Sequence, residues 1–227
     1  MIVTIHQPNF LPWLGFFHKM DQADLFVSLD NVQYTKNSYQ NRCKIKTSQG
    51  EAWVTVPVLT SGKGFPLTHE VEIDNKLNWS KKVWSSLQMA YSKTPYFSEY
   101  KASYEEILLK PWNHLAELTH ALLENTVTLL GITTPMLKAT DLGVEGESTD
   151  LLLAISQKVG ARTYLSGPSG KSYLELAKFS QAGIKVDFHR FQHPQFRQNY
   201  GEFIPYLSVI DLLFNEGPQS LSLLRQG

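Results

Sequence analysis

The chain has 227 residues, enough for one large domain with a full hydrophobic core. Hydrophobic residues make up 42% and charged residues 19%, as in ordinary globular proteins. The 21 basic and 21 acidic side chains cancel, which argues against a general electrostatic grip on nucleic acid or on an anionic membrane. Because no signal peptide and no membrane-length apolar run is visible, we expect a cytoplasmic protein.

The first thirty residues predict a compact βαβ unit. Residues 1–5 have the pattern of a buried strand, and 24–30 that of a second strand. Between them, 12–22 predict a helix with Pro12 in its first turn, where a missing N–H costs nothing. Two strands joined by a helical crossover are expected to pair in parallel.

An insertion is predicted next, at 42–75. Two alternating runs flank a Gly-containing turn and predict an antiparallel hairpin, and 69–74 predict a further short strand. From 78 to 131 the apolar residues recur at helical spacing, and Gly131 is a typical helix stop.

The second half of the chain alternates again between strand and helix patterns. The strands are predicted at 136–143, 163–167 and 185–191, and the helices at 148–161, 171–184 and 203–217. With the opening unit, this pattern predicts an α/β fold: a five-stranded, mostly parallel, doubly wound sheet with helices on both faces. We expect a single domain over 1–227 that carries the antiparallel insertion and the helical segment.

Three unusual loops follow predicted strands, at 6–13, 30–42 and 166–173. In open parallel sheets, ligands bind beyond the carboxyl ends of the strands. We therefore expect the chemistry where these loops meet.

In the first loop, His6 is a candidate acid or base near neutral pH, and Gln7 a candidate for substrate binding. The alternative for His6 is a side chain that only caps the loop backbone. Trp13 could stack on a base or a sugar, or it could pack in the core.

The second loop is rich in amides and poor in apolar residues, which favours recognition of a polar small molecule. Asp30 is its candidate catalytic carboxylate. The candidate substrate-binding residues are Gln33, Asn37, Asn41 and Arg42. The alternative is a plain surface loop.

The third loop, "SGPSGKSY", has two glycines and leads into a predicted helix, a pattern that favours an anion such as phosphate. It lacks the Walker A spacing. The candidate substrate-binding residues are Ser166, Gly167, Ser169, Gly170 and Tyr173. The alternative is a tight turn between strand and helix.

Three further features carry less information. Asp211 lies among apolar neighbours, so it either faces the site and binds substrate or closes a buried polar network. Cys43 fits a half-buried strand residue. His189 and His193 are four residues apart but lack a cysteine or carboxylate partner, so no metal site is predicted.

Several motifs together resemble the WbqC-like family of bacteria, over about 1–220. They are "HQPNFLPWLGFF", "ADLFVSLDNVQY", "NRCKIKT", "AYSKTPYF", "YLSGPSGKSYL", "GIKVDFHRFQHPQF" and "SVIDLLFNEG". The resemblance implies a place in the biosynthesis of O-antigen or other surface polysaccharides. It suggests an enzyme that transfers an aminoacyl group such as glycyl to an amino sugar, and so forms an amide. The alternative is a non-catalytic protein of the same pathway that binds nucleotide sugars.

A weaker resemblance is to pantothenate synthetase, a member of the nucleotidyltransferase-like group that joins a carboxylate to an amine through an acyl-adenylate. It implies ATP with Mg²⁺ as a cofactor. Laid on the HxGH signature of that group, "PWLGFF" places Trp13 and Phe16 where histidines stand. ATP therefore stays a hypothesis, and no other cofactor is expected by name. The expected partner is a small molecule that is phosphate-bearing or an amino sugar, rather than nucleic acid.

Overall fold

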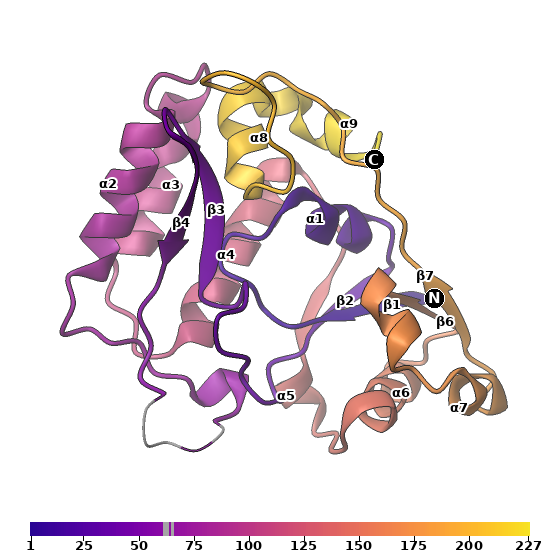
Figure 1. Ribbon diagram of the computed structural model, residues 1–227. Coiled ribbons are helices and arrows are strands. Elements are labelled where there is room, and N and C mark those ends of the chain that lie inside the picture. The colour runs from indigo at the N-terminus through magenta and orange to yellow at the C-terminus, as the bar shows by residue number, and fades with distance from the viewer. Residues whose placement is uncertain (61–63, 65) are drawn as a thin grey trace. The chain divides into compact units, whose positions relative to one another are not determined.

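The computed structural model describes residues 1–60, 64 and 66–227 (Figure 1), so 61–63 and 65 of the predicted insertion lie outside the description. Contacts between residues divide the chain into two compact units. The first holds 1–7, 18–32 and 133–191, and the second holds 8–17, 33–132 and 192–227. The single domain expected over 1–227 stays a prediction.

The first unit contains a five-stranded sheet in which every pairing is parallel. Its strands are β1 (Ile2–His6), β2 (Leu25–Ser28), β5 (Met136–Lys138), β6 (Thr163–Ser166) and β7 (Lys185–Phe188). Their order across the sheet is β5-β2-β1-β6-β7. The predicted α/β class and parallel sheet are thereby confirmed.

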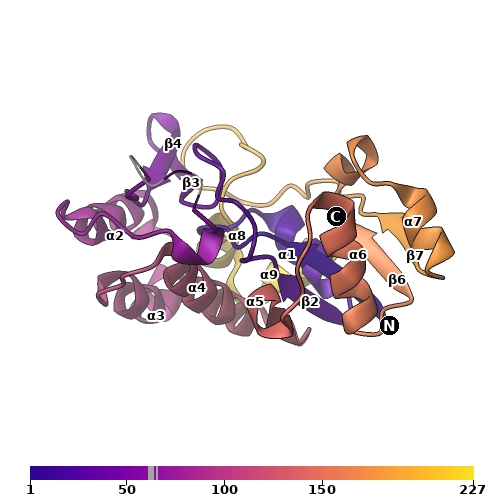
Figure 2. The same ribbon diagram turned by 90° about the horizontal axis from the view of Figure 1, so that it is seen from below.

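The helices of this sheet lie on both of its faces. They are α1 (Leu14–Asp21), whose residues from His18 on belong to the first unit, α5 (Ala139–Leu142), α6 (Ser148–Lys158), the 3₁₀ helix η2 (Pro168–Ser172) and α7 (Leu176–Gln181). The crossovers β1–α1–β2 and β6–α7–β7 step in opposite directions across the sheet, and right-handed connections then put α1 and α7 on opposite faces. In Figure 2, which is seen from below, α6 and α7 lie in front of the sheet.

One sheet face builds the core of the first unit. Alternate residues of β1, such as Val3 and Ile5, point to the same side and are buried with Ile155 of α6. On β6, the Tyr164 ring stacks on Phe179 of α7 with 5.4 Å between centroids. This packing holds the carboxyl ends of β1 and β6 at a defined place beside α6.

The second unit contains the antiparallel hairpin and the helical segment, both as predicted. The hairpin is β3 (Arg42–Thr47) with β4 (Gly50–Thr55), and the helices are α2 (Trp79–Tyr91), α3 (Phe97–Leu109), α4 (Leu115–Leu130), α8 (Val209–Glu216), α9 (Ser220–Leu224) and the 3₁₀ turns η1 (Thr68–Glu70) and η3 (Gly217–Gln219). Phe214 of α8 lies at the centre of an aromatic cluster in this unit. The centroid of its ring is within 6 Å of the ring centroids of Tyr91, Phe97 and Tyr104.

Four predicted elements differ from the structure. The strand expected at 136–143 ends at Lys138, and the residues after it form α5 instead. The strand expected at 69–74 is wrong: the segment begins with η1, and Glu72 and Ile73 make only isolated bridges. Buried and exposed residues do alternate in 71–74, but among the described residues no continuous partner strand runs beside them. The helix expected at 171–184 is split into η2 and α7. The closing helix begins only after Ser208, because Tyr206 has φ of 61°, outside the helical region.

Among the described residues, none of the helices combines the length and the apolar character that crossing a membrane requires.

Candidate functional site

A cavity of about 310 Å³ lies at the carboxyl ends of β1 and β6, within the first unit. The connections from these two strands run in opposite directions, so the cavity is at the switch point of the sheet, where ligands of such folds bind. It is lined by Ile5, His6, Gln7, Lys19, Leu29, Val32, Ser148, Leu151, Leu152, Tyr164, Gly167, Ser169 and Tyr173. Five separate segments of the chain therefore contribute to one site.

His6 ends β1 and lies half-buried in the cavity wall. Its Nδ1 is 2.9 Å from the backbone carbonyl of Gln7, and a carbonyl can only accept, so Nδ1 carries the proton and Nε2 has the lone pair. Burial, helped by the charge of Lys19, lowers the pKa of His6 to about 3. The imidazole is neutral at pH 7 and is a weak base.

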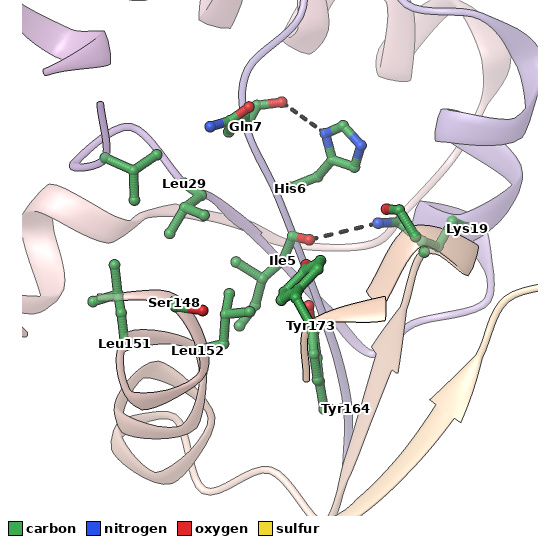
Figure 3. Close-up of a pocket in the computed structure, with 13 residues that line it drawn as sticks. Ile5, His6, Gln7, Lys19, Leu29, Ser148, Leu151, Leu152, Tyr164 and Tyr173 are labelled. Carbon is green, nitrogen blue, oxygen red and sulfur yellow. Dashed lines mark hydrogen bonds between the residues drawn. The ribbon is translucent and has the colours of Figure 1, made fainter. Parts of the chain in front are cut away.

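Lys19 is the main ionisable group that the sequence patterns did not single out. It belongs to α1, its side chain is only 3% exposed, and its Nζ is 3.5 Å from the carbonyl oxygen of Ile5 (Figure 3). No carboxylate among the described residues pairs with it. Burial therefore lowers the pKa of Lys19 to about 7, so a large share of its amine is neutral at physiological pH.

The opposite wall of the cavity is mainly apolar, with Ser148 as a polar residue on it. In Figure 3, Lys19 and the His6 ring lie on one side of β1, and Leu151 and Leu152 of α6 lie on the other, near Leu29. A ligand bound across the end of β1 would contact the Lys19 amine and the His6 imidazole on one side, and leucine side chains on the other.

The loop after β6 supplies a third wall through Gly167, Ser169 and Tyr173. Beneath it, the Ser166 side chain is 1% exposed, and its hydroxyl donates to the Gly167 carbonyl at 3.1 Å. Gly170 packs so closely on Ser166 that no Cβ would fit between them.

The N-terminus of α6 fastens this loop from its other end. The Thr149 hydroxyl donates to the Tyr173 carbonyl at 3.4 Å and accepts from the Glu175 N–H at 3.2 Å. Ser148 adjoins it with φ of 49°, in the left-handed region that serine rarely adopts. Both ends of the loop are thus tied to regular elements.

A substitution of Gly170 tests whether this packing shapes the site. In Gly170→Ala the new Cβ would lie 2.1 Å from Ser166 Oγ and 2.9 Å from Leu174 Cδ1, so the loop must move. We expect a loss of about 1–3 kcal/mol of unfolding free energy, by overpacking, together with weaker ligand binding. The matched control is Gly167→Ala, where the Cβ meets nothing within 4 Å and φ is −65°. Calorimetric melting of both variants checks this, and equal melting temperatures would contradict it.

Five of the sequence-predicted site residues meet in the cavity. They are His6, Gln7, Gly167, Ser169 and Tyr173. Ser166 and Gly170 lie beneath the same loop as supports. Asp30 is in the first unit but does not line the cavity: its carboxylate accepts from the N–H and the hydroxyl of Thr140, each at 3.0 Å. Those bonds make Asp30 a cap for α5.

The other predicted residues belong to the second unit. Trp13 is half-buried and packs edge-on against the exposed ring of Tyr206, with ring centroids 5.4 Å apart, so its role in binding stays a prediction. Gln33 bridges to the backbone of Leu67, and Asn37 is exposed with φ of 57°.

The remaining three second-unit candidates are also held by protein contacts. The Asn41 amide donates to the Val56 carbonyl at 2.9 Å. The Arg42 guanidinium lies 4.3 Å from the centre of the Trp53 ring and donates to the Asn37 carbonyl. Asp211 is completely buried, as the buried-network alternative describes.

The positions that would carry the adenylate-forming signature do not suit a nucleotide phosphate. Trp13 has the contacts just described, and Phe16 is 2% exposed and packs edge-on against Phe17. Neither side chain offers a charge or a strong hydrogen-bond donor in place of histidine. These two positions therefore give no support to ATP and Mg²⁺ as cofactors.

A family model and a curated relative both match nearly the whole chain. The model of the WbqC-like protein family matches residues 7–223. An uncharacterized protein of Mycobacterium tuberculosis, Rv1507c, is 35% identical over 225 residues, which cover 98% of this chain and 97% of that protein. The similarity therefore spans both units, including the cavity residues from Gln7 onwards.

Proposed function

Since the chain belongs to the WbqC-like protein family, and its switch-point cavity holds a buried lysine beside a neutral histidine, we propose that it is an amide-forming acyltransferase. The acceptor is the amine of an amino sugar that carries a phosphate or a nucleotide, and the transferred group is an aminoacyl group such as glycyl. The expected setting is the biosynthesis of O-antigen or another surface polysaccharide, which the family resemblance suggests.

The observation that carries the proposal is the environment of Lys19. An amine acceptor attacks only when it is unprotonated, so the reaction needs a group that removes a proton near pH 7. Lys19 has a pKa of about 7 and lines the cavity, whereas His6, with a pKa of about 3, is a far weaker base. The general-base role expected for His6 from the sequence therefore passes to Lys19.

The proposed reaction forms an amide bond and releases the leaving group of the acyl donor. The acceptor nitrogen attacks the carbonyl carbon of an acyl donor activated as an ester or thioester, and a C–N bond forms. Lys19 takes the proton that the nitrogen loses, and the C–O or C–S bond to the leaving group breaks. Nε2 of His6, which has the lone pair, accepts a hydrogen bond from the substrate and orients it.

The loop at 167–173 supports a phosphate-bearing acceptor. Its Ser169 hydroxyl and the Ser169 backbone N–H are donors that suit an anion, whereas Pro168 has no N–H and the Gly170 N–H donates to the Gly167 carbonyl. Leu151, Leu152 and Val32 offer an apolar surface for the sugar ring or the acyl chain.

The test begins with a thermal-shift screen of nucleotide-linked amino sugars, amino-sugar phosphates and aminoacyl thioesters, because a ligand of the native state raises the melting temperature. Pairs of donors and acceptors that bind are then incubated with the protein, and an amide product is sought by mass spectrometry. We expect product with an amino sugar and none with the matching hydroxyl sugar.

Two results would contradict this function. Binding of nucleotide sugars with no product from any donor would favour the alternative, a non-catalytic binding protein. Product that forms only with a free amino acid and ATP, with release of pyrophosphate, would show that activation takes place on the protein.

A further inference from the structure

His18 and His189 form a buried imidazole pair that the proposed reaction does not use. Nδ1 of His18 lies 2.7 Å from Nε2 of His189, and the two side chains are 3% and 7% exposed. His18 belongs to α1, and His189 directly follows β7, so the contact joins segments 171 residues apart. Both belong to the first unit.

The hydrogen bonds around the pair determine where its protons lie. The Gln22 amide nitrogen is 3.2 Å from Nε2 of His18 and donates to it. Neutral His18 then carries its proton on Nδ1 and donates it to Nε2 of His189. One proton joins the two rings while both stay neutral. A further proton on Nε2 of His189 would push two N–H groups against each other.

The charged and titratable groups near the pair come from α1 and β1. Lys19 follows His18 in α1, and its charge acts on both His189 and His6, while the charge of Asp21 acts on His18. Burial, followed by the charges of His18 and Lys19, lowers the pKa of His189 to about 4. Two neutral rings therefore lie beside the lysine at pH 7.

We propose that His18 and His189 are positioning residues for Lys19: their shared proton holds the α1 turn that carries the amine against the sheet, without adding charge beside it. This inference rests on the role of Lys19 in the proposed function. Without the pair, Nδ1 of His18 loses its acceptor in a buried place, and that turn of α1 must move to expose it. Water then reaches the Lys19 amine and favours its charged form.

The decisive measurement is the reactivity of Lys19, which needs no substrate. The protein is labelled with traces of an acylating reagent from pH 5 to 11, and mass spectrometry quantifies acylation at Lys19. The wild type should reach half-maximal reactivity near pH 7. His189→Leu should move this midpoint upward by at least one pH unit, so that reactivity at pH 7 falls several-fold to tenfold. His189→Gln, whose side-chain oxygen can replace Nε2 as acceptor, should keep the wild-type midpoint.

The same comparison at His18 uses His18→Leu and His18→Asn, because an asparagine amide can replace Nδ1–H as donor. The control is His114→Leu in the second unit, a half-exposed histidine that should leave Lys19 unchanged. If the leucine variants do not fold, ¹⁵N NMR of wild-type histidines decides instead: burial lowers the pKa of His18, so at pH 6.5, where an ordinary histidine is half charged, its ring should be mainly neutral and protonated on Nδ1. Titration of both rings near the ordinary pKa of about 6.5 would overturn the proposal.

The labelling experiment distinguishes the positioning role of the histidine pair from the base role of Lys19. An unchanged midpoint in folded His189→Leu would end the positioning role and leave Lys19 as the base. A wild-type midpoint near the ordinary value of about 10.4 for lysine would remove the base itself, and with it the reason for the pair.

Discussion

Replacing Lys19 with methionine is expected to make the protein inactive and, at the same time, more stable at neutral pH. Methionine has a similar length and no amine, so the cavity wall is kept while the proton acceptor is lost. General-base catalysis typically contributes 10²–10⁴-fold, and we expect turnover in the amide-forming assay to fall by about that factor. Substrate binding, measured by thermal shift, should change much less.

The stability gain has a defined pH dependence. Burial lowers the pKa of Lys19 from 10.5 to about 7, so between these values the folded state binds fewer protons than the unfolded state. Lys19 therefore lowers the free energy of unfolding by the largest amount below about pH 7, and this destabilisation disappears as the pH rises towards 10.5. Lys19→Met should gain on the order of 4 kcal/mol at pH 7 and less than about 1 kcal/mol at pH 10.

Calorimetric melting at the two pH values checks this, with the exposed Lys158 replaced by methionine as the control. A less stable and inactive Lys19→Met would mean that the amine is needed for folding, and its inactivity would then say nothing about catalysis. An active Lys19→Met would end the general-base role.

Replacing Asp211 with asparagine should stabilise the second unit in a pH-dependent manner. Asp211 is 0% exposed, and burial raises its pKa to about 7, although Tyr91, Gln198 and Lys46 beside it act in the other direction. No well-formed hydrogen bond from the described residues reaches either carboxylate oxygen. The folded state therefore binds more protons than the unfolded state from about pH 4 to pH 7, and stability falls as the pH rises through this range.

Asparagine has nearly the same shape and cannot ionise, so it removes this pH dependence. The advantage of Asp211→Asn over the wild type should grow by about 2–3 kcal/mol between pH 5 and pH 8. Urea unfolding followed by tryptophan fluorescence measures it selectively, because all five tryptophans belong to the second unit. The exposed Glu124→Gln is the control. Destabilisation at both pH values would mean that attraction between Asp211 and Lys46 outweighs the cost of burial.

Local sequence patterns determined the architecture of the sheet and the place of the cavity. The apolar runs around Val3 and Val27, separated by a helical pattern, could pair only through a crossover, and this made the strands parallel. In such a sheet the carboxyl ends of the strands gather at one edge. The loops that follow β1 and β6 were therefore expected to meet, and His6, Gln7 and Ser169 line one cavity.

Only the tertiary structure decided which polar side chains line that cavity and which are taken up by other contacts. Lys19 stands in "LGFFHKMD", where its charge suggests a solvent-facing side chain, and its burial comes from the packing of α1 against β1, where Ile5 lies 14 residues away. The carboxylate of Asp30 follows β2 as predicted, yet Thr140, 110 residues later, takes up both its oxygens. The burial of a side chain, and with it its pKa, depends on how the helices and strands pack together, and the local pattern of residues does not encode that packing.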